Sequence, residues 1–395
     1  MKKIFLLISF CLVCSPLSYG ESFSWSKYVP KEGRLKPKPS RINHRKRDLK
    51  KRPLYAVDPN SFRFKDHRRK KELTVLIFGD SGRGESDQYL VGRMMYEKCK
   101  EERCDFALLL GDIIYPSGIS HTKKGEMLSR KDMYQINKKF ELPYKDFHSF
   151  DFWMIPGNHD WYGDVQHAIN YTQKSVRWKM PYNHYEIPWL PKWIRMYGLD
   201  TTRIERLDHK SGLVKEQMET ANKKYLAKTG LVDEQGRNFC SSKGWKILFG
   251  HHGIYTSGRH GKLDMVNIFR NLNPRRVKGV NKYMRQKLYP FIKYCGVQIL
   301  AAGHDHHQEH IKAIDPKTGK MVFHQILQGA AATSRKTEKV NHPEYKSLVT
   351  SSMLGFSILT FTPDKVHVKY FGYPKDHPEE FKMYYETNIY KKDFK

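Results

Sequence analysis

Short apolar runs bounded by polar residues recur along the chain from residue 73 onward. Continuous runs of four to six residues are typical of strands buried on both faces of an α/β sheet. Five such runs occupy residues 73–78, 106–110, 152–155, 245–249 and 297–301. The segment after the first run has the composition of a helix, which we expect near residues 87–100. The pattern predicts an α/β domain.

The last part of the chain has a different pattern. Residues 321–327 and 356–371 alternate apolar and polar side chains, as strands with one buried face do. Pro363 and Asp364 mark a turn within the second segment, so we expect antiparallel strands that complete a second sheet. Residues 189–243 form a long charged stretch, which we interpret as an insertion containing a helix near residues 214–227.

The first twenty residues have the pattern of an export signal. An apolar run over residues 4–14 follows Lys2 and Lys3, and small residues precede Glu21. A transmembrane helix needs about 18 to 20 apolar residues, so this run is too short to be one. We therefore predict a signal peptide over residues 1–20, no transmembrane segment, and a secreted or periplasmic protein.

Positive charge is concentrated near the N-terminus. The chain has 395 residues and a formal net charge of +30. Residues 27–71 hold 18 basic and four acidic residues, several prolines and no apolar periodicity. We interpret residues 21–71 as a poorly ordered arm. The arm is either a solvated linker or a segment that binds an anionic surface or polymer, such as lipid headgroups, cell-wall polymer or nucleic acid.

The cysteines agree with export without proving it. Two of the six lie in the export signal, where bulky residues before them make lipidation the weaker alternative. The other four are Cys99, Cys104, Cys240 and Cys295. Four cysteines allow three disulfide pairings, and buried free thiols are the alternative.

A glycine and a side chain able to bind metal follow each of the five strand-like runs. The segments are Gly-Asp-Ser-Gly at 79–82, Gly-Asp-Ile-Ile-Tyr at 111–115, Gly-Asn-His-Asp at 157–160, Gly-His-His at 250–252 and Gly-His-Asp-His at 303–306. Ligands of α/β sheets bind at the carboxyl ends of strands, so we expect five turns from one sheet to converge. Oxygen and imidazole donors without thiolate suit iron, zinc or manganese. Seven donors, one of them bridging, are what a two-metal centre requires.

In these motifs the sequence resembles the purple acid phosphatases of the calcineurin-like metallophosphoesterase superfamily. The similarity is closest to the small, mammalian-type, tartrate-resistant enzymes. It extends over residues 73–373, includes 162–164, 177–181 and 251–260, and leaves out the basic arm. Two residues depart from the family pattern: Leu248 replaces the usual Val, and Ile113 replaces an Asn after the second motif's Asp. We expect Ile113 to tune the site without abolishing it.

The resemblance implies a role for each motif residue. It implies that Fe(III) is held by Asp80, Tyr115 and His306. It implies that a divalent ion, Fe(II), Zn or Mn, is held by Asn158, His251 and His304. Asp112 would bridge the two ions. Tyr115 is the discriminating residue, because phenolate donation to Fe(III) gives this subfamily its colour.

Three further residues are expected to act on the substrate. His159 follows the ligand Asn158, so it is a candidate to contact the phosphate or to protonate the leaving group. We expect Asp160 to orient His159. By the resemblance, His260 is a histidine of the substrate pocket, the alternative being an ordinary loop histidine. Other nearby side chains are interpreted as bystanders: His252, His307, His310, Tyr255 and Arg259.

The resemblance implies a four-layer α/β/β/α sandwich of two mixed sheets. We expect this domain over residues 72–375, with the charged insertion at about 189–243 and a C-terminal tail over 376–395. The implied function is an exported acid phosphatase that hydrolyses phosphate monoesters by in-line attack of a metal-bound hydroxide. One alternative is a manganese or zinc phosphodiesterase or pyrophosphatase on the same scaffold. Others are a polyanion-binding or cell-surface-binding protein acting through the arm, and radical chemistry at a redox-active iron.

Overall fold

The computed structural model describes residues 54–120, 128–207, 239–261, 279–337, 340 and 342–394. These residues all belong to one compact unit, Pro39–Lys395. The expected signal peptide, the arm up to residue 53 and the expected helix near 214–227 lie outside the described residues. Within the described part, no helix is both long and apolar enough to cross a membrane.

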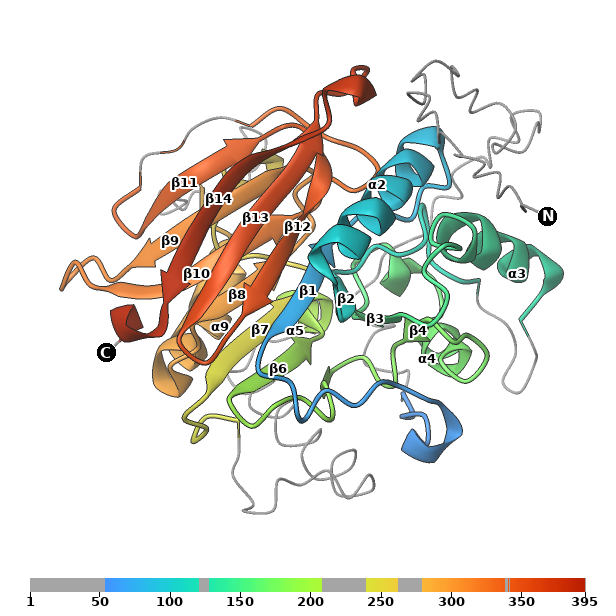
Figure 1. Cartoon of the computed structure of the whole chain (residues 1–395), viewed down its shortest axis with the longest axis horizontal. Coiled ribbons are helices and arrows are strands. Elements are labelled where there is room, and N and C mark those ends of the chain that lie inside the picture. The colour runs from blue at the N-terminus through green and yellow to red at the C-terminus, as the bar shows by residue number, and fades with distance from the viewer. Residues whose placement is uncertain are drawn as a thin grey trace, which may run out of the picture. The chain divides into compact units, whose positions relative to one another are not determined.

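Two seven-stranded mixed sheets form the centre of the domain (Figure 1). Sheet A has the order β14-β13-β12-β1-β2-β3-β4, and sheet B has the order β11-β9-β10-β8-β7-β6-β5. The strands of sheet A are β1 (Leu73–Phe78), β2 (Phe106–Leu109), β3 (Asp151–Met154), β4 (Trp178–Lys179), β12 (Leu354–Phe361), β13 (Lys365–Tyr373) and β14 (Lys382–Tyr390). The strands of sheet B are β5 (Tyr185–Glu186), β6 (Ile194–Leu199), β7 (Trp245–Gly250), β8 (Ile299–Ala302), β9 (Gln308–Ile314), β10 (Met321–Gln328) and β11 (Tyr345–Ser351).

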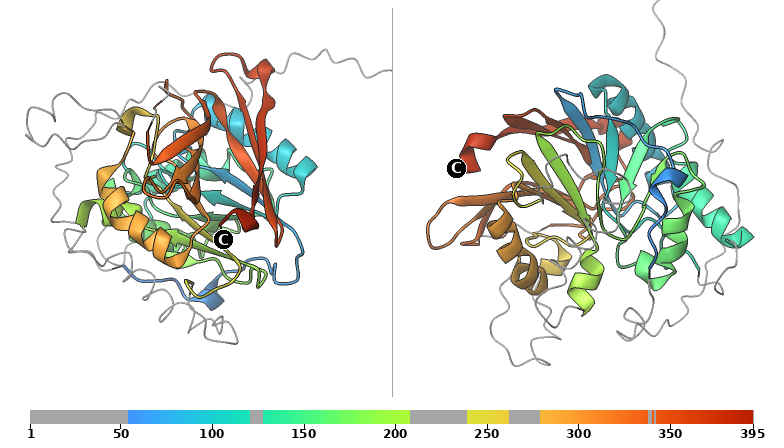
Figure 2. Two further views of the ribbon diagram at one scale, coloured as in Figure 1. Left: turned by 90° about the vertical axis from the view of Figure 1, so that its left-hand side faces the viewer. Right: turned by 90° about the horizontal axis from the view of Figure 1, so that it is seen from below.

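Helices cover the outer faces of the two sheets, as the view from below in Figure 2 shows. The α-helices are α2 (Ser86–Glu102), α3 (Arg130–Ile136), α4 (Val165–Tyr171), α5 (Thr201–Leu207) and α9 (Lys282–Cys295). Short helical turns are η2 (Pro59–Ser61), η3 (Asn137–Glu141), η4 (Asp160–Tyr162), η6 (Arg259–Gly261), η7 (Pro378–Glu380) and η8 (Lys391–Phe394). Helix α2 packs on β1 and β12, whereas α5 and α9 pack together on the side of sheet B.

Alternating side chains of the strands divide the core into two layers. Ile247 and Phe249 of β7 belong to the core that joins the two sheets, whereas Leu248 between them packs in the layer under α9. Helix α9 fills that layer because Met284, Leu288 and Ile292 recur every four residues on its buried face. The arrangement is the predicted four-layer sandwich of two mixed sheets, which is confirmed.

The five predicted strands are present, but they do not belong to one sheet. Strands β1, β2 and β3 are parallel neighbours in sheet A, and β7 and β8 are parallel neighbours in sheet B. The expectation that five turns of a single sheet converge was therefore wrong. The carboxyl ends of two facing sheets supply the loops instead, and this arrangement lets a site be closed from both sides.

The second part of the expected arm packs on the domain. Val57 and Phe62 are buried, and they act as apolar anchors within the basic segment. The backbone N–H of Val57 donates to the Pro181 carbonyl at 2.9 Å, and that of His67 donates to the Trp189 carbonyl at 3.0 Å. Residues 54–71 are thus an ordered strap, in contrast to the predicted arm.

Two other expected boundaries are corrected by strands that the sequence pattern did not reveal. Strand β14 lies within the expected tail and pairs antiparallel with β13, so the sheet continues beyond residue 375. Strand β6 lies within the expected insertion and pairs parallel with β7. Because β14 is a mostly exposed edge strand, its sequence lacks the apolar alternation that predicts a strand.

Two disulfides join the four cysteines. Cys99 pairs with Cys104 at the end of α2, and Cys240 pairs with Cys295 at the end of α9. This is one of the three pairings that the sequence left open. None of these four cysteines is a free thiol, so the alternative of buried free thiols is excluded.

Candidate metal centre

The loops that follow the strands hold three of the predicted metal ligands in an uncommon backbone conformation. Asp80, Asp112 and His304 have φ angles of 57°, 52° and 71°. Residues other than glycine rarely adopt such positive φ values, which cost of order 1–3 kcal/mol each and concentrate at functional sites. The strained turns direct these side chains toward a common point between the sheets.

The three predicted ferric ligands form one cluster. The phenol oxygen of Tyr115 donates to Oδ1 of Asp80 at 3.0 Å and lies 3.2 Å from Nε2 of His306. That nitrogen is 3.4 Å from Asp80 Oδ1. Three potential ligand atoms from three different loops therefore face one another at a buried point.

The three predicted ligands of the divalent ion form a second cluster. Nε2 of His251 lies 3.1 Å from Oδ1 of Asn158 and 3.1 Å from Nδ1 of His304. Oδ1 of Asp112 is 3.5 Å from the same imidazole nitrogen. Ligand atoms of Asp80, Asp112 and His251 all lie within 4.8 Å of one another, so the two clusters are adjacent. The structure thus brings all seven predicted residues together.

The hydrogen bonds of the second cluster show that it fits a cation. Nδ1 of His251 donates to the carbonyl oxygen of Leu110 at 2.7 Å, so in the neutral imidazole Nε2 carries a lone pair. That lone pair faces the amide oxygen of Asn158 and a carboxylate oxygen of Asp112. Electron pairs that face one another repel unless a positive charge lies between them. The donor set therefore suits a bound metal ion.

The environment of Tyr115 points the same way. Burial raises the pKa of its phenol well above the usual value of 10, and the carboxylates of Asp80 and Asp112 raise it further. Without a strong positive charge the phenol stays protonated, in keeping with its hydrogen bond to Asp80. Phenolate donation at this position therefore requires a bound cation.

Asp160 has a different role from the expected one. Its carboxylate accepts backbone N–H groups of Gly157 at 2.8 Å, Ile113 at 3.1 Å and Ile114 at 3.2 Å. The expected contact with the imidazole of His159 is replaced by these bonds. Burial raises the pKa of Asp160 to about 7, and the charge of Asp112 adds to the shift. Asp160 therefore positions the loop of Asp112 against the loop of Asn158.

Ile113, which departs from the family pattern, contributes its backbone N–H to Asp160 and packs its side chain into the core. Its side chain is 1% exposed. The polar contact expected from an Asn at this position is therefore replaced by apolar packing below the loop.

His159 lies at the exposed side of the clusters. Its Nδ1 donates to the carbonyl oxygen of Pro116 at 2.6 Å, and its Nε2 lies 4.0 Å from Oδ2 of Asp112. The imidazole also packs against the ring of Tyr115, with 4.5 Å between ring centres. One ring nitrogen is thus anchored, and the other is left near the bridging carboxylate.

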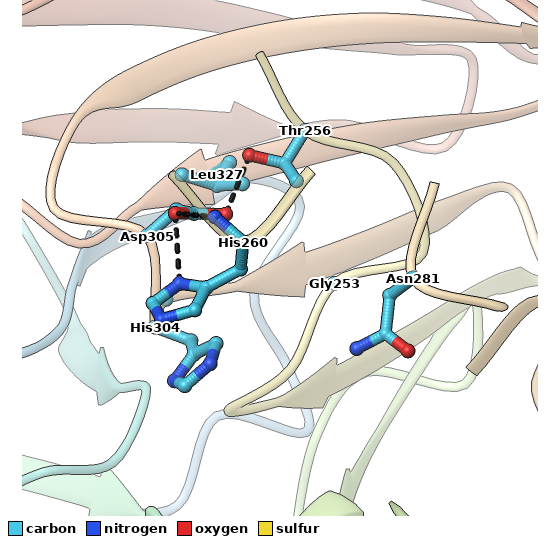
Figure 3. A pocket seen from close by; sticks show the side chains of 8 residues that line it. Gly253, Thr256, His260, Asn281, His304, Asp305 and Leu327 are labelled. Atoms are coloured by element: carbon cyan, nitrogen blue, oxygen red, sulfur yellow. Dashed lines mark hydrogen bonds and ion pairs between the residues drawn. The ribbon is translucent and has the colours of Figure 1, made fainter. Parts of the chain in front are cut away.

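His260 lies on the other side of the site, next to a small pocket (Figure 3). Its ring stacks on that of His304 with 3.9 Å between centres. Its Nδ1 and its backbone N–H both bind Oδ1 of Asp305, at 2.9 and 3.1 Å. Burial favours a raised pKa for Asp305, but hydrogen bonding to His260 holds the pKa well below its usual range.

Several residues that hold this loop were missed by the sequence reasoning. Glu309 accepts the N–H and hydroxyl of Ser257 at 2.8 and 2.6 Å. Thr201 at the start of α5 accepts the N–H groups of His251 at 3.0 Å and of His252 at 2.9 Å. Asp305 had a local signal, because it stands between two ligands of the last motif. Thr201 and Glu309 had none.

The predicted bystander histidines have partners of their own. His252 lies 3.2 Å from Glu205, His307 lies 2.9 Å from Glu309, and His310 lies 2.8 Å from His324. Tyr255 donates to Glu344 at 2.9 Å. These contacts favour the seven clustered residues as the donor set, although a ring nitrogen of His252 also lies within 4.8 Å of ligand atoms of His251 and His304.

The family comparison agrees with this donor set. The family described as calcineurin-like phosphoesterase matches residues 73–308, which carry all five motifs. This chain belongs to that family. As a member, it is a phosphoester hydrolase by class, and the match ends just after the last predicted ligand, His306.

Sequence relatives of this chain include purple acid phosphatases. Tartrate-resistant acid phosphatase type 5 of Oryctolagus cuniculus is 23% identical over 276 residues, which are 67% of this chain and 74% of that protein. Purple acid phosphatase 17 of Arabidopsis thaliana is 23% identical over 253 residues, which are 62% of this chain and 65% of that protein. The resemblance inferred from the motifs is thus confirmed at low identity.

Solved structures show that the fold is shared. The Plasmodium protein described as GAP50, the anchor in the inner membrane complex, has a TM-score of 0.58 and 18% identity, covering 81% of this chain and 89% of its own. The purple acid phosphatase PPD1 from yellow lupin seeds has a TM-score of 0.54 and 16% identity, covering 82% of this chain and 55% of its own. These likenesses concern the fold alone.

Proposed function

We propose that this chain is an exported binuclear-metal acid phosphatase, which hydrolyses phosphate monoesters by in-line attack of hydroxide on phosphorus. The observation that carries the proposal is the pair of adjacent clusters, each made of three donors, with Asp112 beside both. Its carboxylate is close to His251 and contributes to the pKa shift of Tyr115. A carboxylate shared by both clusters would let two ions lie about 3.5–4 Å apart, as they do in two-metal sites.

The donors support an assignment of the two ions. Asp80, Tyr115 and His306 would hold Fe(III), because a phenolate and a carboxylate are hard donors. Neutral Asn158, with His251 and His304, would hold a divalent ion, Fe(II), Zn or Mn. When bound, the two ions lower the pKa of a water molecule, orient the phosphoryl oxygens and neutralise the charge that develops on them.

In this proposal, two histidines act on the substrate. His159 keeps Nδ1 on the Pro116 carbonyl, which leaves Nε2 free to contact a phosphoryl oxygen or to protonate the leaving oxygen. His260 is held by Asp305 against His304, so its imidazole borders the space in which a substrate would lie. Asp160 acts through the backbone of both ligand loops and does not touch the substrate.

Export rests on two observations. The first twenty residues have the pattern of a signal peptide. The two disulfides agree with an oxidising compartment, because such bonds are rare in the cytosol.

The acid phosphatase proposal is favoured over a manganese or zinc phosphodiesterase by the position of Tyr115. Its hydroxyl lies within hydrogen-bond distance of two other predicted ligands. Surface binding through the basic arm and radical chemistry stay predictions. The first rests on the composition of a segment that lies mostly outside the described residues.

The test compares the purified full chain with the Asp112→Asn variant. We expect about two metal ions per chain in the wild type and hydrolysis of 4-nitrophenyl phosphate at acidic pH. Loss of the shared carboxylate should lower metal content and reduce kcat by more than about 100-fold, since outer residues of metal sites already cost 10- to 100-fold. The control is Asp364→Asn in the exposed turn between β12 and β13. Full activity in Asp112→Asn would overturn the proposal.

A further inference from the structure

Arg83 lies beside the first ligand cluster without a carboxylate partner. Its guanidinium carbon is 5.3 Å from the ring centre of Tyr115. Its Nε is buried and makes no hydrogen bond within the described parts of the chain. Among the described residues, no carboxylate oxygen lies within 4.0 Å of a guanidinium nitrogen of Arg83, so Arg83 forms no ion pair there. The charge of Arg83 has only a small lowering effect on the pKa of Asp87, which lies farther away than an ion-pair partner would.

Three other half-buried arginines of this chain are each neutralised by a glutamate, and the pairs are Arg177 with Glu141, Arg195 with Glu186 and Arg285 with Glu344. A charge that is partly removed from water is costly unless an opposite charge or hydrogen-bond acceptors satisfy it. Arg83 thus has donors to offer to an acceptor that the chain itself does not supply.

The backbone at Arg83 is fixed relative to the metal ligands. The N–H of Gly82 donates to the Asp112 carbonyl at 3.3 Å, and the N–H of Tyr115 donates to the Gly82 carbonyl at 2.8 Å. The two loops approach so closely that a Cβ at Gly82 would lie 1.8 Å from the Ile113 carbonyl oxygen. The guanidinium therefore extends from a point that cannot shift without moving the ligand loop.

Two lysines add positive charge on this side. Gly84 packs on Lys138 and Lys139, where an added Cβ would lie 3.0 and 3.1 Å from their side chains. The Nζ of Lys139 donates to the Tyr115 carbonyl oxygen. The cations Arg83, Lys138 and Lys139 outnumber the nearby carboxylates of Glu85 and Asp87, so the surroundings of Arg83 favour an anion.

We propose that Arg83 forms a subsite for a second phosphoryl group, so that substrates with a diphosphate group, of which inorganic pyrophosphate is the simplest, are preferred over simple monoesters. The planar fork of a guanidinium matches the oxygens of a phosphoryl group and binds them in pairs. Arg83 lies next to Tyr115 but outside the ligand cluster. This position suits the second phosphoryl group of a diphosphate, which adjoins the phosphoryl group that reacts. The inference rests on the proposed phosphatase function and names its substrate class.

The reaction balances with water as the only co-reactant. An oxygen of water forms a bond to the phosphorus held at the ligand clusters, and the bridging P–O bond breaks. The bridging oxygen keeps the electron pair of that bond and leaves as part of the second phosphate, which Arg83 would hold. The proton lost by the water ends on one of the two phosphate products.

The test measures kcat/KM of the metal-loaded full chain for pyrophosphate and for 4-nitrophenyl phosphate. Arg83→Gln should lower the value for pyrophosphate about tenfold or more beyond any loss on the monoester, because hydrogen bonds to charged groups are strong. Arg83→Lys should restore part of the difference. An equal loss on both substrates, or an unchanged ratio between them, would overturn the proposal.

Arg203→Gln is the matched control. Arg203 also has a buried Nε without a hydrogen bond in the described chain, and its guanidinium lies 6.0 Å from the ring centre of Trp161. Removing Arg203 from the ring of Trp161 should leave the ratio of kcat/KM for pyrophosphate to kcat/KM for 4-nitrophenyl phosphate as it is in the wild type. A change of ratio as large as that of Arg83→Gln would count against a specific subsite.

Calorimetric titration separates failure of the subsite from failure of the proposed function. If the wild type hydrolyses neither compound with any metal, the phosphatase proposal fails. The subsite is then decided by binding alone: pyrophosphate should bind about tenfold tighter than phosphate, and Arg83→Gln should remove that difference. Equal affinities for the two anions in the wild type would reject the subsite.

Discussion

The loops of sheet A and the loops of sheet B hold their metal ligands by different means. On the side of sheet A, one buried carboxylate, Asp160, ties two loops together through their backbone N–H groups. On the side of sheet B, a longer loop over residues 253–261 is held by side chains that come from other elements, among them Asp305 and Glu309. In sheet A a single residue therefore holds the ligand loops in position, whereas in sheet B several residues share this role.

The largest combined effect on stability and metal binding is expected at Asp160, where one residue holds two ligand loops. Asp160→Ala leaves buried backbone N–H groups of Gly157 and Ile113 without an acceptor, at about 1–3 kcal/mol each. We expect a loss of about 3 kcal/mol or more in unfolding free energy and a fall in metal affinity of about 100-fold. Urea denaturation and metal titration measure the two quantities. Unchanged metal affinity would show that Asp160 does not organise the loops.

The two disulfides offer a second comparison between the sheets. Cys240–Cys295 closes a chain separation of 55 residues on the side of sheet B, against five for Cys99–Cys104 at α2. Loop-closure entropy predicts a loss of about 4 kcal/mol on removing the first and about 2 kcal/mol on removing the second. Paired Cys→Ser variants compared by urea denaturation test this order. A larger loss for Cys99–Cys104 would contradict it.

Sheet B also carries a buried histidine pair that makes stability depend on pH. Nδ1 of His324 lies 2.8 Å from Nε2 of His310, and burial lowers the pKa of His324 from 6.5 to about 4, with Lys312 contributing. The unfolded chain takes up a proton below pH 6.5, whereas the folded chain does so only near pH 4. Stability is therefore full above pH 6.5 and falls by up to about 3 kcal/mol toward pH 4.

The variant His324→Phe should remove the share of this dependence that comes from His324, while buried His310, whose pKa is also lowered well below 6.5, keeps its own share. Urea denaturation at pH 7 and pH 4.5 measures it, and the control is His367→Phe on β13, where the side chain is 33% exposed. If the wild type and His324→Phe lose the same stability on acidification, the pair is not the cause.

The smallest effect is expected where several residues share one loop. Glu309→Gln weakens the bonds to Ser257 but leaves Asp305 on His260. We expect kcat/KM for 4-nitrophenyl phosphate to fall about tenfold, mainly through KM, with metal content unchanged. Glu386→Gln on the exposed edge strand β14 is the control. Loss of bound metal in Glu309→Gln would show that this loop also holds the ligands.

The strands and the ligand set could be predicted from the sequence because their signals are local. A strand buried on both faces, such as Leu73–Phe78, is a continuous apolar run. Each ligand of the predicted set stands within a few residues of such a run. The resemblance then supplied the grouping into two clusters, which the distances in the structure match.

The parts that could not be predicted depend on contacts between distant segments. The partners of Asp160 lie on another loop, 47 residues away at Ile113, and nothing near Asp160 in the sequence identifies them. Strand β14 is an edge strand with mostly exposed side chains, so its pattern resembles that of a tail. Val57 and Phe62 are isolated apolar residues in a basic segment, where composition outweighs them.

The most direct test of the proposed ferric centre is a visible absorption spectrum of the purified protein, paired with iron quantification and the Tyr115→Phe variant. We expect a broad charge-transfer band that is absent from the variant, because the phenolate of Tyr115 would be the donor to Fe(III). A colourless protein without iron that still hydrolyses phosphate esters with added manganese or zinc would contradict the ferric assignment and leave only the family.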